Sequence, residues 1–148
     1  MTALTPPSPK APGRGYLAVL ATVLTVALLV FVDGMLSLAL DRNVVEATDA
    51  GPLVGPAMAL AVCAVVFLTV LRRSPRSLGP RILSATLWAL IAGPAAGAVL
   101  YSIVREELGV IPVFFGSSLL SPFWIAAALV AGLVVGLAGL AERMPPAT

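Results

Sequence analysis

Histidine is absent from this sequence, and cysteine occurs only once, at Cys63. The lack of histidine removes the commonest metal ligand and the side chain that most often serves as a base near neutral pH. A single cysteine cannot form a disulfide bond within the chain, so it does not indicate a redox compartment. Because Cys63 lies inside an apolar run, we interpret it as a small buried hydrophobic side chain.

Charged residues are also scarce. They make up 11% of the 148 residues, hydrophobic residues make up 59%, and the mean hydropathy is +1.05. Because soluble domains carry about 25% charged residues, the polar side chains here are too few to cover a water-soluble globule. The length allows one domain, and the composition predicts that a lipid bilayer surrounds most of it.

Motifs that would indicate an enzyme are missing as well. The sequence contains no glycine-rich phosphate loop, no cluster of metal ligands and no haem motif. Ser117, Ser118 and Ser121 cluster, but there is no histidine to activate them and no lysine nearby. We therefore expect no catalytic residues, no cofactor and no metal, and we interpret the protein as non-enzymatic.

Long apolar runs are what the sequence does contain. A membrane-spanning helix needs about 20 apolar residues, and four runs approach or exceed that length. A signal peptide is the alternative interpretation of the first run, with a cleavage-like motif at 37–39. We prefer a retained span, because its apolar core exceeds the roughly 7–15 residues of a signal peptide and three more spans follow. The predicted spans are 16–40, 53–71, 82–104 and 123–140.

The predicted organisation is an all-α, four-span transmembrane helical bundle. It comprises a disordered, proline-rich tail at 1–15, a membrane domain at 16–141 and a short tail at 142–148. Four spans place both termini on the same side of the membrane.

A basic loop between the second and third spans orients this bundle. It holds four of the nine basic residues, and a short loop this basic resists crossing a bilayer. The loop is therefore predicted to be cytoplasmic, and its arginines are also candidates for binding anionic lipid headgroups. These arginines are Arg72, Arg73, Arg76 and Arg81.

The remaining charges follow the same division. Seven of the nine basic residues fall on the side of the basic loop, whereas five of the seven acidic residues fall on the opposite side. This bias predicts a multi-pass protein of the cell membrane with both termini in the cytoplasm. It also argues against nucleic-acid binding, because the bases lie at span ends rather than on one soluble face.

Among the charged residues of the sequence, only Asp33 lies clearly within a predicted span. A charge in the bilayer is costly, so such residues are usually functional or paired. Asp33 lies roughly 25 Å along the helix from Tyr16, toward the outer face. We prefer to interpret it as an outer-end residue paired with Arg42 or Arg105. The alternative is a site for protons or cations within the membrane.

Two glycine pairs indicate close helix packing. Gly93 and Gly97 flank Pro94 in the third span, and Gly132 and Gly136 lie in the fourth. Glycines at this spacing let helices approach closely, and packing inside the bundle is preferred here over a dimer seam. Pro94 is expected to kink its helix and could act as a hinge, although a static kink is preferred.

Residues 108–122 are apolar but interrupted by glycine and proline, at Gly109, Pro112, Gly116 and Pro122. We expect this segment to lie in the outer headgroup region or to fold back against the bundle as irregular backbone.

The chain resembles small uncharacterised four-helix membrane proteins of high-GC Gram-positive bacteria. Arginine outnumbers lysine eight to one, and alanine, valine, leucine and glycine dominate the spans. The resemblance covers the whole chain through composition and layout, and it implies residence in the plasma membrane. With its four spans and the acid Asp33 in the first, the chain is also similar to the small multidrug-resistance exporters. Those of dual topology carry little charge bias, unlike this chain.

Two functions follow as expectations. The first is an accessory or structural membrane protein whose partners are the lipid bilayer, other membrane subunits or itself. The alternative is a small oligomeric transporter or channel that works through Asp33 and the Pro94 kink.

Overall fold

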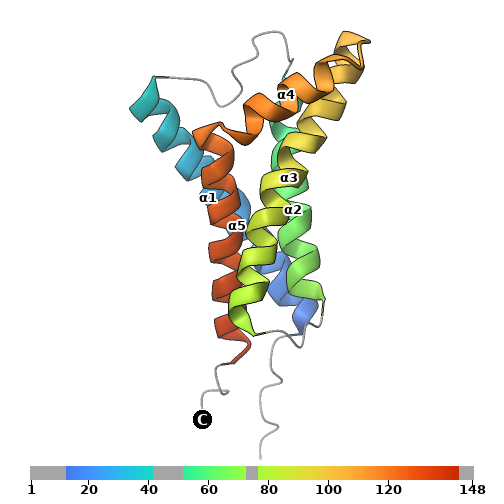
Figure 1. Ribbon diagram of the computed structural model, residues 1–148. Helices are drawn as coiled ribbons and strands as arrows, with labels where there is room; N and C mark the ends of the chain where they lie inside the picture. Colours follow the sequence, from blue (N-terminus) through green and yellow to red (C-terminus); the bar gives the residue numbers. More distant parts are fainter. Residues whose placement is uncertain (1–12, 42–51, 73–76, 144–148) are drawn as a thin grey trace, which may run out of the picture.

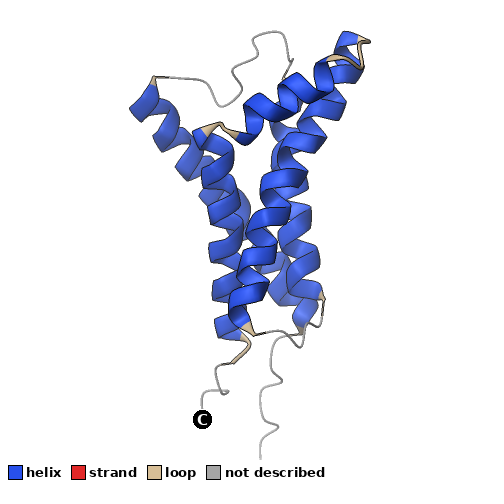
Figure 2. Cartoon of the chain, viewed as in Figure 1, coloured by secondary structure: helices blue, strands red, loops and turns tan. Residues whose placement is uncertain are grey.

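The computed structural model describes residues 13–41, 52–72 and 77–143. These residues form helices and connecting turns, with no strand in the described ranges (Figure 2). Four of the helices are long and apolar enough to cross a membrane, and α4 is shorter. The helices are α1 (Arg14–Leu40), α2 (Val54–Leu71), α3 (Leu78–Arg105), α4 (Val110–Leu119) and α5 (Pro122–Ala141).

The four long helices run side by side, and α4 lies across one end of them (Figure 1). Helix α3 packs against α2, α4 and α5, and α1 packs against α2 and α5. The start of α1 and the end of α5 lie at the same end of the bundle. We call this end, which holds Arg14, Arg72 and Arg143, the basal end. The opposite end, which holds Asp41 and Glu106, is the distal end.

The contact between α2 and α3 is formed by two rows of residues spaced four apart. On α2 the row is fully buried and mostly valine. On α3 the facing row consists of small residues in its middle, which lets the two backbones approach closely. The rows are Val54, Met58, Val62, Val66 and Val70 on α2, and Arg81, Ala85, Ala89, Gly93 and Gly97 on α3.

Burial is uneven among the long helices. Within the most apolar 18-residue window of each helix, 67% of residues are buried in α5 but only 22% in α1. Helix α5 is therefore the central element of the bundle. Helix α1 is peripheral, and its distal half diverges from the other helices (Figure 1).

Residues 108–122 differ from the expectation of irregular backbone. They contain α4, which folds back against α3, so the described residues include a helix beyond the four predicted spans. Pro112 is the third residue of α4, where its missing N–H removes no helical hydrogen bond. Pro122 begins α5, a position at which proline is favoured. The prolines therefore mark helix starts within this segment.

Helix α3 also extends beyond the predicted span at 82–104, and again a proline lies in the first turn of the helix. The predicted loop between the second and third spans includes Gly79 and Pro80, yet the helix begins at Leu78. Pro80 is the third residue of this helix, again within the first turn. At its other end α3 stops at Glu106, whose φ of 53° is left-handed and cannot continue the helix.

Candidate functional site

Asp33 lies one turn beyond the buried Leu29, on the side of α1 that faces the bundle. Its side chain is half-buried. Its Oδ1 atom is buried and accepts no hydrogen bond from any residue that the structure describes. Of the two predicted partners, Arg42 lies outside the described residues. The guanidinium of Arg105 lies 5.8 Å from the ring centroid of Tyr101. Asp33 therefore has an acceptor atom that a donor from outside this part of the chain could use.

The level of Asp33 in the bundle follows from the antiparallel contact of α1 and α5. Leu24 of α1 and Val134 of α5 line the same cavity. Asp33 is nine residues beyond Leu24, which places it about level with Ile125 in the first turn of α5. Ser121 lies immediately before that turn, and its hydroxyl oxygen is also buried without a hydrogen-bond partner in the described ranges. Two such polar atoms therefore lie at a similar level in the distal half.

Gly93, Pro94 and Gly97 are buried in α3, and the two glycines face α2. A Cβ atom added at Gly93 would lie 3.3 Å from Cγ2 of Val62, and one added at Gly97 would lie 2.5 Å from Sδ of Met58. These contacts occur within one chain, so this glycine pair serves the α2–α3 contact. Helix α3 continues through Pro94 as one helix.

Gly132 and Gly136 serve the contact between α5 and α3 in the same way. A Cβ atom at Gly132 would collide with Oγ1 of Thr86, and one at Gly136 would lie 3.1 Å from Cδ1 of Ile82. Thr86 in turn donates its hydroxyl to the carbonyl oxygen of Ile82, at 3.1 Å. Both glycine pairs thus lie where two helices of the same bundle meet.

Arg81 joins three helices at the basal end. Its Nη1 atom donates to Oε2 of Glu142, just past the end of α5, at 2.9 Å. Its Nη2 atom donates to the carbonyl oxygens of Thr69 and Val70, in the last turn of α2, at 3.2 and 3.4 Å. These carbonyls have no partner within their own helix. A cation at this position also complements the helix dipole of α2.

This arrangement separates Arg81 from the other arginines of the basic loop. The Arg81 side chain is only 9% exposed and is bound inside the bundle, so it does not present its charge to lipid headgroups as the prediction for the basic loop expects. Arg72 is exposed and stays a candidate. Arg73 and Arg76 lie outside the described residues.

A second cluster lies at the distal end, where α4 meets α3. The rings of Tyr101 and Phe114 have centroids 4.9 Å apart, and Arg105 lies over the Tyr101 ring. A cavity of about 390 Å³ adjoins this cluster, and Glu107 and Ser117 are among its lining residues. The cavity combines a carboxylate, a hydroxyl and two aromatic rings with the apolar side chains of Val110 and Val113.

The role of Arg81 was missed in the sequence, although a signal for it was present. Arg81 begins the row of residues spaced four apart that continues through Ala85, Ala89, Gly93 and Gly97. An arginine in register with small residues on one helix face indicates burial with them. This pattern was overlooked because the four neighbouring arginines were interpreted as one group.

Comparison with known proteins complements this geometry. In the described parts of the chain, no group of three or more histidine, cysteine, aspartate or glutamate side chains could hold a metal ion. No curated protein and no solved structure matches the chain. One family model does match, over residues 14–143, a range that contains every helix of the described residues. The chain therefore belongs to the DUF6121 family, a family of unknown function.

Proposed function

We propose that this chain is an integral protein of the cell membrane with both termini in the cytoplasm. We propose further that it acts without catalysis, as an accessory or structural subunit. Support for the orientation comes from the two ends of the bundle. The basal end carries Arg14, Arg72 and Arg143, whereas Asp41 and Glu106 lie at the distal end. Basic residues are retained on the cytoplasmic side of membranes, which supports a cytoplasmic basal end.

The observation that carries the subunit role is the contrast between a filled interior and a peripheral α1. Glycines and fully buried valines form closely packed contacts among α2, α3 and α5. Helix α1 instead exposes a broad apolar face, on which Val30 is 71% and Phe31 is 64% exposed. A rigid bundle with one lightly covered apolar helix is suited to packing against another membrane protein.

Purification of the tagged full chain from native membranes in a mild detergent tests this role. We expect a second membrane polypeptide at a fixed ratio, quantified by mass spectrometry. Changing Phe31 to alanine should lower that ratio several-fold. The matched change Leu60→Ala, at a position of α2 that is 69% exposed, should leave it unchanged. Equal ratios in both variants, or a homo-oligomer without a second polypeptide, would contradict the proposal.

The second candidate is an oligomeric transporter or channel for protons or cations. It is favoured by the buried oxygen of Asp33 that has no partner among the described residues. The isosteric change Asp33→Asn distinguishes the two functions. A transporter would lose its ion flux in proteoliposomes at least tenfold, with thermal stability retained. For an accessory subunit, neither folding nor the ratio of the co-purified partner should change.

A further inference from the structure

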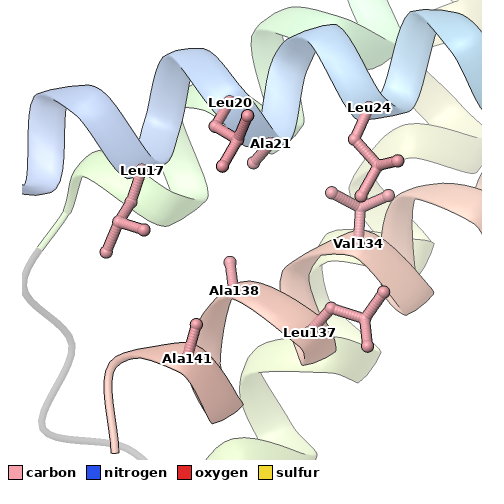
Figure 3. A pocket seen from close by; sticks show the side chains of 8 residues that line it. All are labelled: Leu17, Leu20, Ala21, Leu24, Val134, Leu137, Ala138 and Ala141. Carbon is pink, nitrogen blue, oxygen red and sulfur yellow. The ribbon is translucent and has the colours of Figure 1, made fainter. Parts of the chain in front are cut away.

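Near the basal end, α1 and α5 are separated by a groove of about 170 Å³ (Figure 3). Its lining side chains come from both helices and are all alanine, valine or leucine. Ala21 of α1 and Ala138 and Ala141 of α5 lie on its walls. The alanine methyl groups leave a space between the helices that larger side chains would fill. An empty space of this kind lacks the dispersion contacts that normally hold helices together.

The dimensions of the groove suit a single hydrocarbon chain. It extends from Leu17 to Leu24 along α1, which corresponds to about 10 Å of helix length. A helix with its side chains is about 10–12 Å across, which is too wide for a groove of this volume. Part of an acyl chain can enter it, because an acyl chain has no side groups.

The basal end of the groove is positively charged. Arg14 lies one turn before Leu17, and Arg143 follows Ala141 by two residues; both arginines are exposed. The intervening acid, Glu142, is bound to Arg81 at 2.9 Å, so its charge is already matched. An apolar groove with an exposed arginine within one turn of its basal end on each helix is complementary to a molecule with a hydrocarbon chain and an anionic head.

We propose that the groove between α1 and α5 binds an anionic phospholipid. One acyl chain lies along Ala21, Ala138 and Ala141, and the phosphate of the headgroup lies between Arg14 and Arg143. The lipid fills the gap between the peripheral α1 and the central α5. It therefore acts as part of the basal end of the bundle.

Native mass spectrometry of the full chain tests this proposal. The protein is stripped of lipid in detergent and titrated with phosphatidylglycerol or with phosphatidylcholine of the same acyl chains. We expect one phosphatidylglycerol to bind at least tenfold more tightly than phosphatidylcholine. Glycerol phosphate, which has the anionic group without the chains, should not bind at the same concentrations.

Variants separate the head and chain contacts. The double change Arg14→Gln with Arg143→Gln should remove the preference for phosphatidylglycerol, whereas Arg105→Gln, an exposed arginine at the distal end, should preserve it. Ala138→Leu fills the groove and should weaken the binding of both lipids. Because Ala138 is buried and its change could disturb folding, Ala141→Leu provides a second test at an exposed position of the lining. Ala64→Leu, at an exposed position of α2, is the matched control.

Three results would overturn the proposal. The first is equal affinity for the two lipids in the unaltered protein. The second is equal binding in the Ala141→Leu and Ala64→Leu variants when both are folded. The third is a homodimer that binds no lipid, because a second copy would then cover the groove.

Discussion

Gly97 packs where α3 meets both α2 and α4. A methyl group added there would lie 2.5 Å from Sδ of Met58 and 3.0 Å from Cε1 of Phe114. Met58 is fully buried, so its side chain must repack among its neighbours to admit the methyl group. We expect Gly97→Ala to destabilise the bundle by about 1–3 kcal/mol through overpacking. The single buried cysteine, Cys63, provides the measurement, since a thiol-reactive dye labels it on heating only as the bundle unfolds.

Gly34 supplies the control for that change. It lies inside α1, and a methyl group added there would meet nothing within 4 Å. Gly34→Ala should therefore be neutral or stabilising by up to about 1 kcal/mol, because alanine favours the helix. In a Met58→Ala background, Gly97→Ala should lose most of its cost, since the methyl group then fills vacated space. An equal cost in both backgrounds would show that Met58 is not the obstacle.

Arg81 is the second residue whose replacement is expected to lower the stability of the bundle. Changing it to glutamine breaks the ion pair with Glu142 and leaves carbonyl oxygens at the end of α2 without donors. Because both side chains are largely buried, we expect the free energy of unfolding to fall by about 2–3 kcal/mol. Thermal unfolding followed by labelling of Cys63 measures this loss.

Two comparisons make the Arg81 result specific. Arg72→Gln removes an exposed arginine at the same end of the bundle and should change stability by less than about 0.5 kcal/mol. A double-mutant cycle with Glu142→Gln isolates the ion pair. Additive losses in that cycle would mean that the pair itself contributes no stability.

At the scale of elements, α4 depends on its contact with α3. Phe114 is 8% exposed and packs on Tyr101 and against Gly97. Phe114→Ala should weaken this contact by about 3 kcal/mol or more and release α4 from α3. We expect faster amide hydrogen exchange in α4, with exchange in α2 and α5 unchanged.

Val113, the residue before Phe114 in α4, provides the matched position. It is 73% exposed, so Val113→Ala removes apolar atoms without removing the contact with α3. Exchange in α4 should then be unaltered. Similar acceleration in the two variants would mean that Phe114 does not hold α4 in place.

The sequence predicted the long helices well because the bilayer requires apolar runs of a certain length. It predicted α4 poorly because the glycines and prolines of residues 108–122 were interpreted as interruptions of regular backbone. In this chain Pro56, Pro80 and Pro112 are each the third residue of a helix, where the missing N–H has no consequence. The position of a proline relative to an apolar run is therefore more informative than its presence.

Other features depend on contacts between distant segments and could not be predicted from local patterns. The ion pair of Arg81 joins residues 61 positions apart. The groove between α1 and α5 likewise exists only because alanines at 21 and 138 face each other in the fold. Asp33 was singled out from the sequence, but its buried oxygen without a described partner was revealed only by the packing.

At the scale of the whole molecule, the proposed orientation in the membrane rests on where the charges lie after folding. Ser77 lies at the basal end before α3, and Leu108 lies at the distal end between α3 and α4. Both are exposed, so a cysteine at either position is chemically accessible. In a Cys63→Ala background, we expect a membrane-impermeant maleimide to label Leu108→Cys on intact cells. Ser77→Cys should be labelled only after the cells are permeabilised.

The contrast between these two positions tests the physical cause of the orientation. If cationic side chains at the basal end hold it in the cytoplasm, then removing them should weaken the preference. Replacing Arg14, Arg72 and Arg143 together with glutamine should allow a fraction of Ser77→Cys to be labelled on intact cells. Labelling of Ser77→Cys without those replacements would show an inverted protein. Equal labelling at both positions would show dual topology, which is a property of some small exporters but not one expected from so biased a charge distribution.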